Sequence, residues 1–282
     1  MKNFLLKIIP VTTLHTLLLH SMSTVVVKTD NKIKLTAVIN ALEQNEENAH
    51  TIVPGFSTYP LALLAESDEN IPTVHALLYN YAVKPWTRDT FSATPLHNAA
   101  RSGAYQNLYL ILKRARLTVP NFNKFINQVN QVGKTALHNA IENEKYECAT
   151  LLLHFGAAIN KTDPTEKTAL HFLCSHNFRC APETIQQRKK MFIQLFAHGA
   201  LLDLYDKQGK KPKSLLESQQ PKTPEEKERQ AEMLTCFNTI KPSQLVTELE
   251  KDPSLFYAHL PNDIKSIIQS LLLECANCPN PS

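Results

Sequence analysis

One short pattern recurs along this chain and constrains its fold more than any other feature. Residues 135–138 read Thr-Ala-Leu-His and return unchanged at residues 168–171, which is 33 positions later. A related copy, Thr-Pro-Leu-His, occupies residues 94–97, 41 positions before the first. Self-similarity at a period of roughly 20–50 residues indicates a stack of similar units, each of which buries its apolar face against its neighbours. The chain is therefore predicted to fold as a linear stack.

The recurring pattern resembles the ankyrin repeat, which consists of a β-turn finger, a short helix that opens at Thr-Pro-Leu-His, and a second helix that returns. The resemblance implies an all-α ankyrin-repeat solenoid of about four repeats over residues 59–220, with openings at Tyr59, Thr94, Thr135 and Thr168. The first opening reads Tyr-Pro-Leu-Ala and departs from the pattern at two positions. Terminal repeats often depart in this way because one of their sides has no neighbouring repeat.

Two repeats are longer than the 33-residue period. The second spans 41 residues, so it carries eight extra residues (41 against 33), which we place around residues 118–125. The fourth runs 43 residues, from Thr168 to the next opening at Lys211, so it carries ten extra residues (43 against 33). We expect these to lie in residues 177–190, between the two helices of the repeat.

The glycines independently support the repeat frame. Five of the six lie where the pattern needs a sharp reversal of the chain: Gly103 between helices, Gly156 and Gly199 after a second helix, and Gly133 and Gly209 in fingers. Glycine adopts a positive φ without steric penalty, and just past a helix end it helps to satisfy the last carbonyls.

The histidine of the opening pattern has two interpretations, a structural one and a metal site. The resemblance implies that His97, His138 and His171 each bond to a neighbouring finger and so form a ladder. A metal site would need further ligands, and no carboxylate or cysteine is fixed beside each histidine. We therefore predict a structural ladder, with no metal and no cofactor.

The segments that flank the repeats carry weaker signals. For residues 1–30 two interpretations stay open, an apolar leader such as a secretory signal or a disordered N-terminus. Residues 31–58 are predicted to contain a capping helix, because apolar residues recur there at helical spacing. Residues 221–282 are predicted to form a C-terminal helical extension that begins at a capping box, Thr223-Pro224-Glu225-Glu226. No apolar run of roughly 18 residues occurs, so no membrane span is expected.

The end of the chain resembles the opening of an F-box, whose helix docks the adaptor of a cullin-type ubiquitin ligase. Ankyrin proteins of poxviruses and of intracellular bacteria end with similar segments. The residues that would dock the ligase adaptor are Leu260, Pro261, Ile264, Ile267, Ile268 and Leu271. The same apolar stripe would also serve a helix that only caps the stack, and both interpretations stay open.

Composition and motifs bound the classes of function. The net charge of +4 is too small to imply nucleic-acid binding without a basic face. None of the common nucleotide-binding, metalloprotease or nucleophile-elbow motifs occurs. Cys174 lies near His171 and His176, but the repeat frame places it at a small buried position, where packing is favoured over a nucleophile. We therefore predict that the chain is not an enzyme.

The partner surface follows from the resemblance, because ankyrin stacks bind through finger tips and the exposed side of each first helix. The residues predicted to face a partner are Trp86, Arg88, Phe91, Asn98, Arg101, Ser102, Asn139, Glu142, Asn143, Phe172, Ser175 and His176. Trp86 has an alternative role, which is to fill the gap beneath the degenerate first repeat.

The predicted function is protein–protein recognition by a monomeric adaptor. The long insertions and the unusual tail resemble ankyrin proteins that intracellular bacteria deliver into host cells. The expected location is therefore the cytoplasm or, for such an effector, the cytosol of a host cell. Two alternatives stay open, an F-box-like adaptor that recruits a cullin ubiquitin ligase and an enzyme with an unrecognised C-terminal domain.

Overall fold

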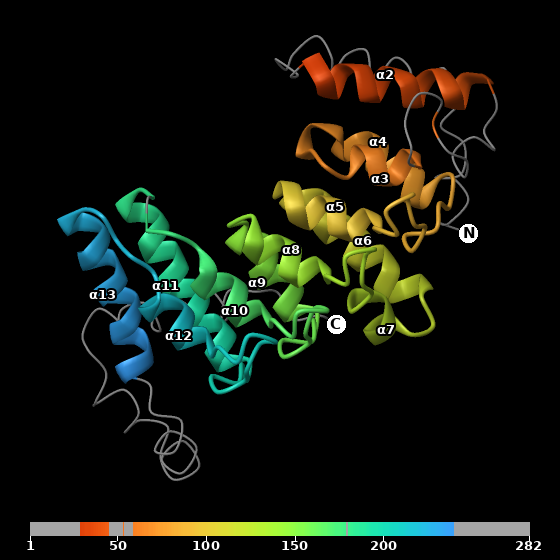
Figure 1. Ribbon diagram of the computed structural model, residues 1–282. Coiled ribbons are helices and arrows are strands. Elements are labelled where there is room, and N and C mark those ends of the chain that lie inside the picture. Colours follow the sequence, from red (N-terminus) through yellow and green to blue (C-terminus); the bar gives the residue numbers. More distant parts are fainter. Residues whose placement is uncertain (1–28, 45–52, 54–58, 179, 240–282) are drawn as a thin grey trace, which may run out of the picture. The chain divides into compact units, whose positions relative to one another are not determined.

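The computed structural model describes residues 29–44, 53, 59–178 and 180–239. Over these residues the chain forms helices joined by loops and turns, with no strand, as Figure 1 shows. This confirms the all-α, ankyrin-type class predicted from the repeat pattern. The chain divides into two compact units, Met1–Ala169 and Leu170–Ser282, which are described separately.

The first unit consists of helix pairs preceded by one further helix. Its helices are α2 (Thr29–Gln44), α3 (Pro60–Leu64), the short 3-10 helix η2 (Asp68–Asn70), α4 (Ile71–Tyr79), α5 (Pro95–Ser102), α6 (Tyr105–Thr118), α7 (Phe122–Ile126), α8 (Ala136–Glu142) and α9 (Tyr146–His154). The first helices α3, α5 and α8 pack side by side, and the second helices α4, α6 and α9 form a layer behind them (Figure 1). Helix α2 packs against α3 at the start of the stack.

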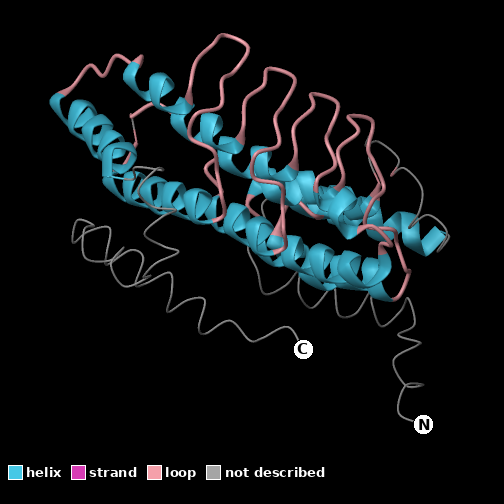
Figure 2. Ribbon diagram, turned by 90° about the horizontal axis from the view of Figure 1, so that it is seen from below, coloured by secondary structure: helices cyan, strands magenta, loops and turns pink. Residues whose placement is uncertain are grey.

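The leucine of each opening pattern anchors the pairs. Leu61, Leu96 and Leu137 are all buried, because the third position of the pattern points between the two helix layers. Burial of such a side chain contributes about 1.5–3 kcal/mol. The loops that lead from each second helix to the next first helix leave the helices on one side, where Figure 2 shows them in pink.

The first insertion forms a short helix, α7, close to its predicted place. Asn121 begins it, since its side chain accepts a hydrogen bond from the Lys124 N–H at 2.9 Å. Phe125 and Ile126 are buried, and Phe122 lies against Phe155 with ring centroids 6.2 Å apart. The extra residues thus add apolar contacts to the layer of second helices.

The second unit contains α10 (Ala169–Ser175, which begins at the boundary), α11 (Pro182–Ala197), α12 (Pro212–Glu217) and α13 (Pro224–Thr239). The expectation that the second insertion lies between two helices needs correction. Helix α11 is 16 residues long whereas α9 has nine, so most of the extra residues lengthen the second helix. Pro182 at the start of α11 suits the first turn of a helix, where no backbone donor is needed.

The end of the described chain follows the predicted capping pattern. The Thr223 hydroxyl accepts a hydrogen bond from the Glu226 N–H at 3.2 Å, and the Glu226 carboxylate accepts one from the Lys222 N–H. Helix α13 then packs against both α11 and α12, with Met233, Cys236 and Phe237 buried.

The buried amide of Asn107 is one of the links between the degenerate first repeat and the second. Asn107 on α6 donates hydrogen bonds from Nδ2 to the carbonyls of Leu64 at 3.3 Å and Ser67 at 2.7 Å. Replacing Asn107 by Ala leaves those carbonyls without this donor and is expected to destabilise the first unit by about 2 kcal/mol in urea unfolding. Gln106→Ala, which changes an exposed neighbour, should change stability by less than about 0.5 kcal/mol. Equal effects of the two variants would contradict this role.

Candidate functional site

Four fingers in the described residues are each closed by one acidic or amide side chain. We define finger 1 as residues 89–93, finger 2 as 130–134, finger 3 as 163–167 and finger 4, in the second unit, as 206–210. The Asp89 Oδ1 accepts from the N–H groups of Phe91 and Ala93 at 2.9 and 2.8 Å, and the first residue of each other finger acts in the same way. These side chains replace missing backbone partners at the turn.

The closing residue of the finger was missed in the sequence, although a signal was present. Asp89, Asn130 and Asp163 each lie five positions before the threonine that opens the next helix, and Asp206 lies five positions before Lys211. An Asp or Asn at a constant offset before a repeated motif indicates a side-chain-closed turn.

Each of the three histidines bonds to a carbonyl in the following finger or within two residues of it, as the predicted ladder requires. The Nδ1 of His97 accepts from the Thr94 N–H at 3.2 Å, so its Nε2–H is free to donate to the carbonyls of Gln128 and Lys134 at 3.1 and 3.2 Å. In the next repeat the Nε2 of His138 lies 2.9 Å from the Lys161 carbonyl. The Nε2 of His171, in the second unit, lies 3.3 Å from the Lys210 carbonyl.

Burial keeps two of these rings neutral. It lowers the pKa of His97 from 6.5 to about 4, although the hydrogen bonds to Lys134 and Gln128 raise it. It lowers the pKa of His138 to about 4 as well, against the bond to Lys161. Both rings therefore serve as neutral connectors between a first helix and the loop that leads to the next one.

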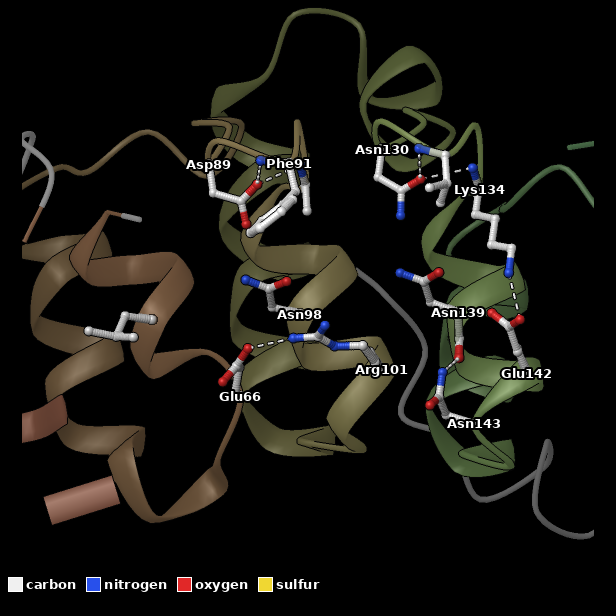
Figure 3. A pocket seen from close by; sticks show the side chains of 13 residues that line it. Glu66, Asp89, Phe91, Asn98, Arg101, Asn130, Lys134, Asn139, Glu142 and Asn143 are labelled. Atoms are coloured by element: carbon white, nitrogen blue, oxygen red, sulfur yellow. Dashed lines mark hydrogen bonds and ion pairs between the residues drawn. The ribbon is translucent and has the colours of Figure 1, made fainter. Parts of the chain in front are cut away.

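A groove lies between the fingers and the first helices of the first unit, with a volume of about 380 Å³. The residues that line it are Leu63, Glu66, Asp89, Phe91, Ala93, Asn98, Arg101, Asn130, Val132, Lys134, Asn139, Glu142 and Asn143. Figure 3 shows the finger residues above and the helix residues below. The groove thus combines apolar finger tips with a polar floor.

The finger tips at the mouth of the groove are apolar and held together. Phe91 is 66% exposed and Val132 is 60% exposed, and they occupy the same position in fingers 1 and 2. The Gln131 N–H donates to the Phe91 carbonyl at 2.9 Å and so joins the two tips. Exposed large apolar side chains gathered in this way are typical of an interaction site.

Four charged side chains of the groove form two ion pairs. Arg101 lies 2.7 Å from Glu66, which also binds Lys34 of α2 at 2.9 Å. Lys134 of finger 2 pairs with Glu142 of α8 at 2.5 Å. These pairs orient the side chains more than they stabilise the fold, since exposed ion pairs contribute roughly 0–1 kcal/mol.

The predicted partner-facing residues divide into three groups. Those that line the groove are Phe91, Asn98, Arg101, Asn139, Glu142 and Asn143. Trp86, Arg88 and Ser102 belong to the first unit but do not line it. Trp86 is half-buried, and exposed Arg88 donates to the Val129 carbonyl at 3.2 Å. Phe172, Ser175 and His176 belong to the second unit.

Three of these residues do not face solvent as expected. Asn98 and Asn139 are each only 7% exposed, and Phe172 is 6% exposed. All three directly follow the histidine of the opening pattern, and this position is covered in each repeat. Asn98 shows the reason, because its Nδ2 donates to the Ala62 carbonyl of α3 at 3.2 Å. The partner-binding role of the whole set stays a prediction.

The segment predicted to dock a ligase adaptor, Leu260 to Leu271, lies outside the described residues, as do residues 1–28. Within the described ranges, no helix is both long and apolar enough to cross a bilayer, and no three potential ligands gather to hold a metal.

The buried thiols are poorly suited to nucleophilic chemistry. Cys174 is buried, and burial raises the pKa of its thiol far above the ordinary value. Burial likewise raises the pKa of Cys148 to about 12. The thiolate is the nucleophilic form, so packing is the better account of both residues.

Comparison with known families agrees with the repeat frame. A family model described as "Ankyrin repeats (3 copies)" matches the chain in two overlapping stretches, residues 61–163 and residues 111–187. The first stretch contains every residue that lines the groove. No curated protein matches the chain.

Proposed function

We propose that this chain, which carries ankyrin repeats over residues 61–187, is a non-enzymatic adaptor that holds a protein partner in the groove of its first unit. Ankyrin repeats support a role in protein–protein interaction, and their finger tips and first helices are the surfaces available for it. The observation that carries the choice of the groove is the pair Phe91 and Val132, two exposed apolar side chains fixed side by side over a polar floor.

Exposure of these two apolar side chains to water is unfavourable, and a partner that covers them removes this cost. Aromatic anchors contribute strongly to binding when a partner removes them from water. Fingers closed by Asp89 and Asn130 hold the two tips in place before a partner arrives, so little conformational entropy is lost on binding.

The capture of partner proteins tests this proposal. Wild-type protein and the Phe91→Ser/Val132→Ser variant are immobilised at equal density and exposed to a eukaryotic lysate. The proteins captured by the wild type should fall at least about tenfold with the variant, as expected for the loss of an apolar anchor.

A matched control is available outside the groove. Leu117 is 73% exposed at the end of α6, so Leu117→Ser removes exposed apolar surface without touching the groove. The Leu117→Ser variant should capture the same lysate proteins as the wild type. Circular dichroism should show equal helix content for the wild type and both variants. Equal capture by wild type and the finger variant would contradict the proposal.

A further inference from the structure

The floor of the groove contains two asparagines at equivalent positions whose amides are used differently. Asn98 follows His97 on α5, and Asn139 follows His138 on α8; Figure 3 shows them at corresponding places on neighbouring helices. The Asn98 amide donates to the Ala62 carbonyl at 3.2 Å. The Asn139 amide bonds to no other group in the described part of the chain, although only 7% of the residue is exposed.

Helix length explains this difference. Helix α3 ends at Leu64, so the Ala62 carbonyl lies in the last turn, where carbonyls have no intrahelical partner. The corresponding carbonyl for Asn139 is that of His97, inside α5, which continues to Ser102. An internal carbonyl already accepts from the backbone of its own helix, whereas the Ala62 carbonyl at the helix end lacks such a donor and accepts from Asn98 instead.

Most of Asn139 is buried, but its amide atoms are not among the fully enclosed polar atoms that lack a partner, so they reach the groove. Asn139 lines the groove, so a molecule in the groove can satisfy it. The other polar groups there are committed: Arg101 to Glu66, Lys134 to Glu142, and the Asn130 Oδ1 to its own finger. Asn139 is thus a polar residue of the floor whose whole side-chain amide, donor and acceptor together, is open toward a ligand.

The chemistry of the amide indicates what this ligand is. An asparagine side chain offers N–H donors and a carbonyl acceptor at one end, which complement the C=O and N–H of a peptide unit. An extended chain has these groups free, whereas a helix uses them internally. Arg101 and Lys134 are each paired with a glutamate, and the Asp89 carboxylate accepts from its own finger, so the charged groups of the groove are already engaged and do not favour a charged ligand.

We infer that the groove binds a short, extended, uncharged segment of the partner. The Asn139 amide pairs with one main-chain peptide unit of this segment, while an apolar side chain of the segment packs against Phe91 and Val132. This inference rests on the proposed function and adds to it the form of the partner and the residue that recognises its main chain.

Selection from a random library of dodecapeptides displayed on phage tests the inference. The full chain serves as bait, and peptides that also bind Phe91→Ser/Val132→Ser are removed. The peptides that remain should share an apolar residue within an uncharged stretch. By fluorescence anisotropy, Asn139→Leu, which keeps the site filled, should weaken their binding about tenfold, since one hydrogen-bonded amide is lost. Asn123→Ala, an exposed asparagine on α7 outside the groove, should leave binding unchanged.

Main-chain recognition is tested on the ligand itself, with wild-type protein that needs no folding control. Each peptide bond of a selected peptide is N-methylated in turn. N-methylation at one position should weaken binding to the wild-type protein about tenfold. The same N-methylation should weaken binding to Asn139→Leu less than about twofold.

Each outcome has a clear consequence. Undiminished binding to Asn139→Leu, N-methyl effects that are the same for both proteins, or a library that yields no groove-dependent peptide would each overturn the inference. The proposed function is judged separately by lysate capture, which depends on the finger tips and not on Asn139.

Discussion

Lowering the pH from 7.5 to 4.5 is expected to remove about 4 to 6 kcal/mol from the free energy of unfolding of the first unit. Burial lowers the pKa of both His97 and His138 to about 4, whereas an unfolded histidine titrates near 6.5. Below pH 6.5 the unfolded chain therefore binds more protons than the folded chain, and stability falls with pH until the folded rings also titrate. Each histidine contributes about 2 to 3 kcal/mol to this loss, against total stabilities of about 5–15 kcal/mol.

The charged groups around the two rings are consistent with the same pH range for the loss of stability. Arg88 and Asp89 face His97 with opposite charge, and Asp163, Lys134 and Glu142 surround His138. Burial raises the pKa of Asp163, but hydrogen bonds from Thr165 and Lys167 outweigh it and leave the pKa below 3.8. The contribution of that carboxylate is therefore present above pH 3.8 and does not overlap with the histidine window.

Urea unfolding followed by circular dichroism at pH 8, 6.5, 5.5 and 4.5 measures the effect. The free energy should change little between pH 8 and 7 and then fall by roughly 2 to 3 kcal/mol per pH unit near pH 5. His138→Gln removes one of the two titrating rings, so its slope should be about half that of the wild type. A free energy that stays constant from pH 7 to 5 would show that the two rings are not buried as described.

The fold could be predicted from sequence because the repeat fixes local geometry. The motif from Thr135 to His138 marks the start of a first helix, so its recurrence predicts where the neighbouring helices begin. Gly103 and Gly156 adopt the positive φ expected of them. Each histidine bonds to a carbonyl in the following finger or within two residues of it, because the repeat places that loop beside the first helix whatever the number of residues between them. In such cases a short motif contains all the information that its own structure needs.

The site could be predicted only in part, because exposure depends on the neighbouring repeat. The repeat pattern correctly predicts that one equivalent position is occupied by Asn98, Asn139 and Phe172. Nothing in the motif shows that side chains at this position are buried by neighbouring residues. Whether the amide at that position finds a partner depends on where the preceding helix ends, as Ala62 and His97 show. The lengthening of α11 depends on tertiary packing with α13 in the same way.

Replacing Gly133 by Ala is expected to destabilise the first unit by about 2 to 5 kcal/mol. Gly133 has a φ of +74°, a left-handed conformation that costs a residue with a side chain about 1–3 kcal/mol. An added Cβ would also lie 2.3 Å from both Cδ and Cγ of Pro164, next to the first residue of finger 3. Since a proline ring cannot rotate away, one finger must shift, and such overpacking costs a further 1–3 kcal/mol or so.

Two variants in the same unit separate these contributions in urea unfolding. Gly156→Ala meets no atom within 4 Å and has a φ of +87°, so it should cost only the backbone strain, about 1–2 kcal/mol. Glu166 occupies in finger 3 the place of Gly133, with a φ of +62°, so Glu166→Gly relieves strain and should stabilise by up to about 1 kcal/mol. Because all three residues share the left-handed conformation, only contact with Pro164 can make Gly133→Ala the most costly change. Equal costs for Gly133→Ala and Gly156→Ala would mean that fingers 2 and 3 are not in close contact.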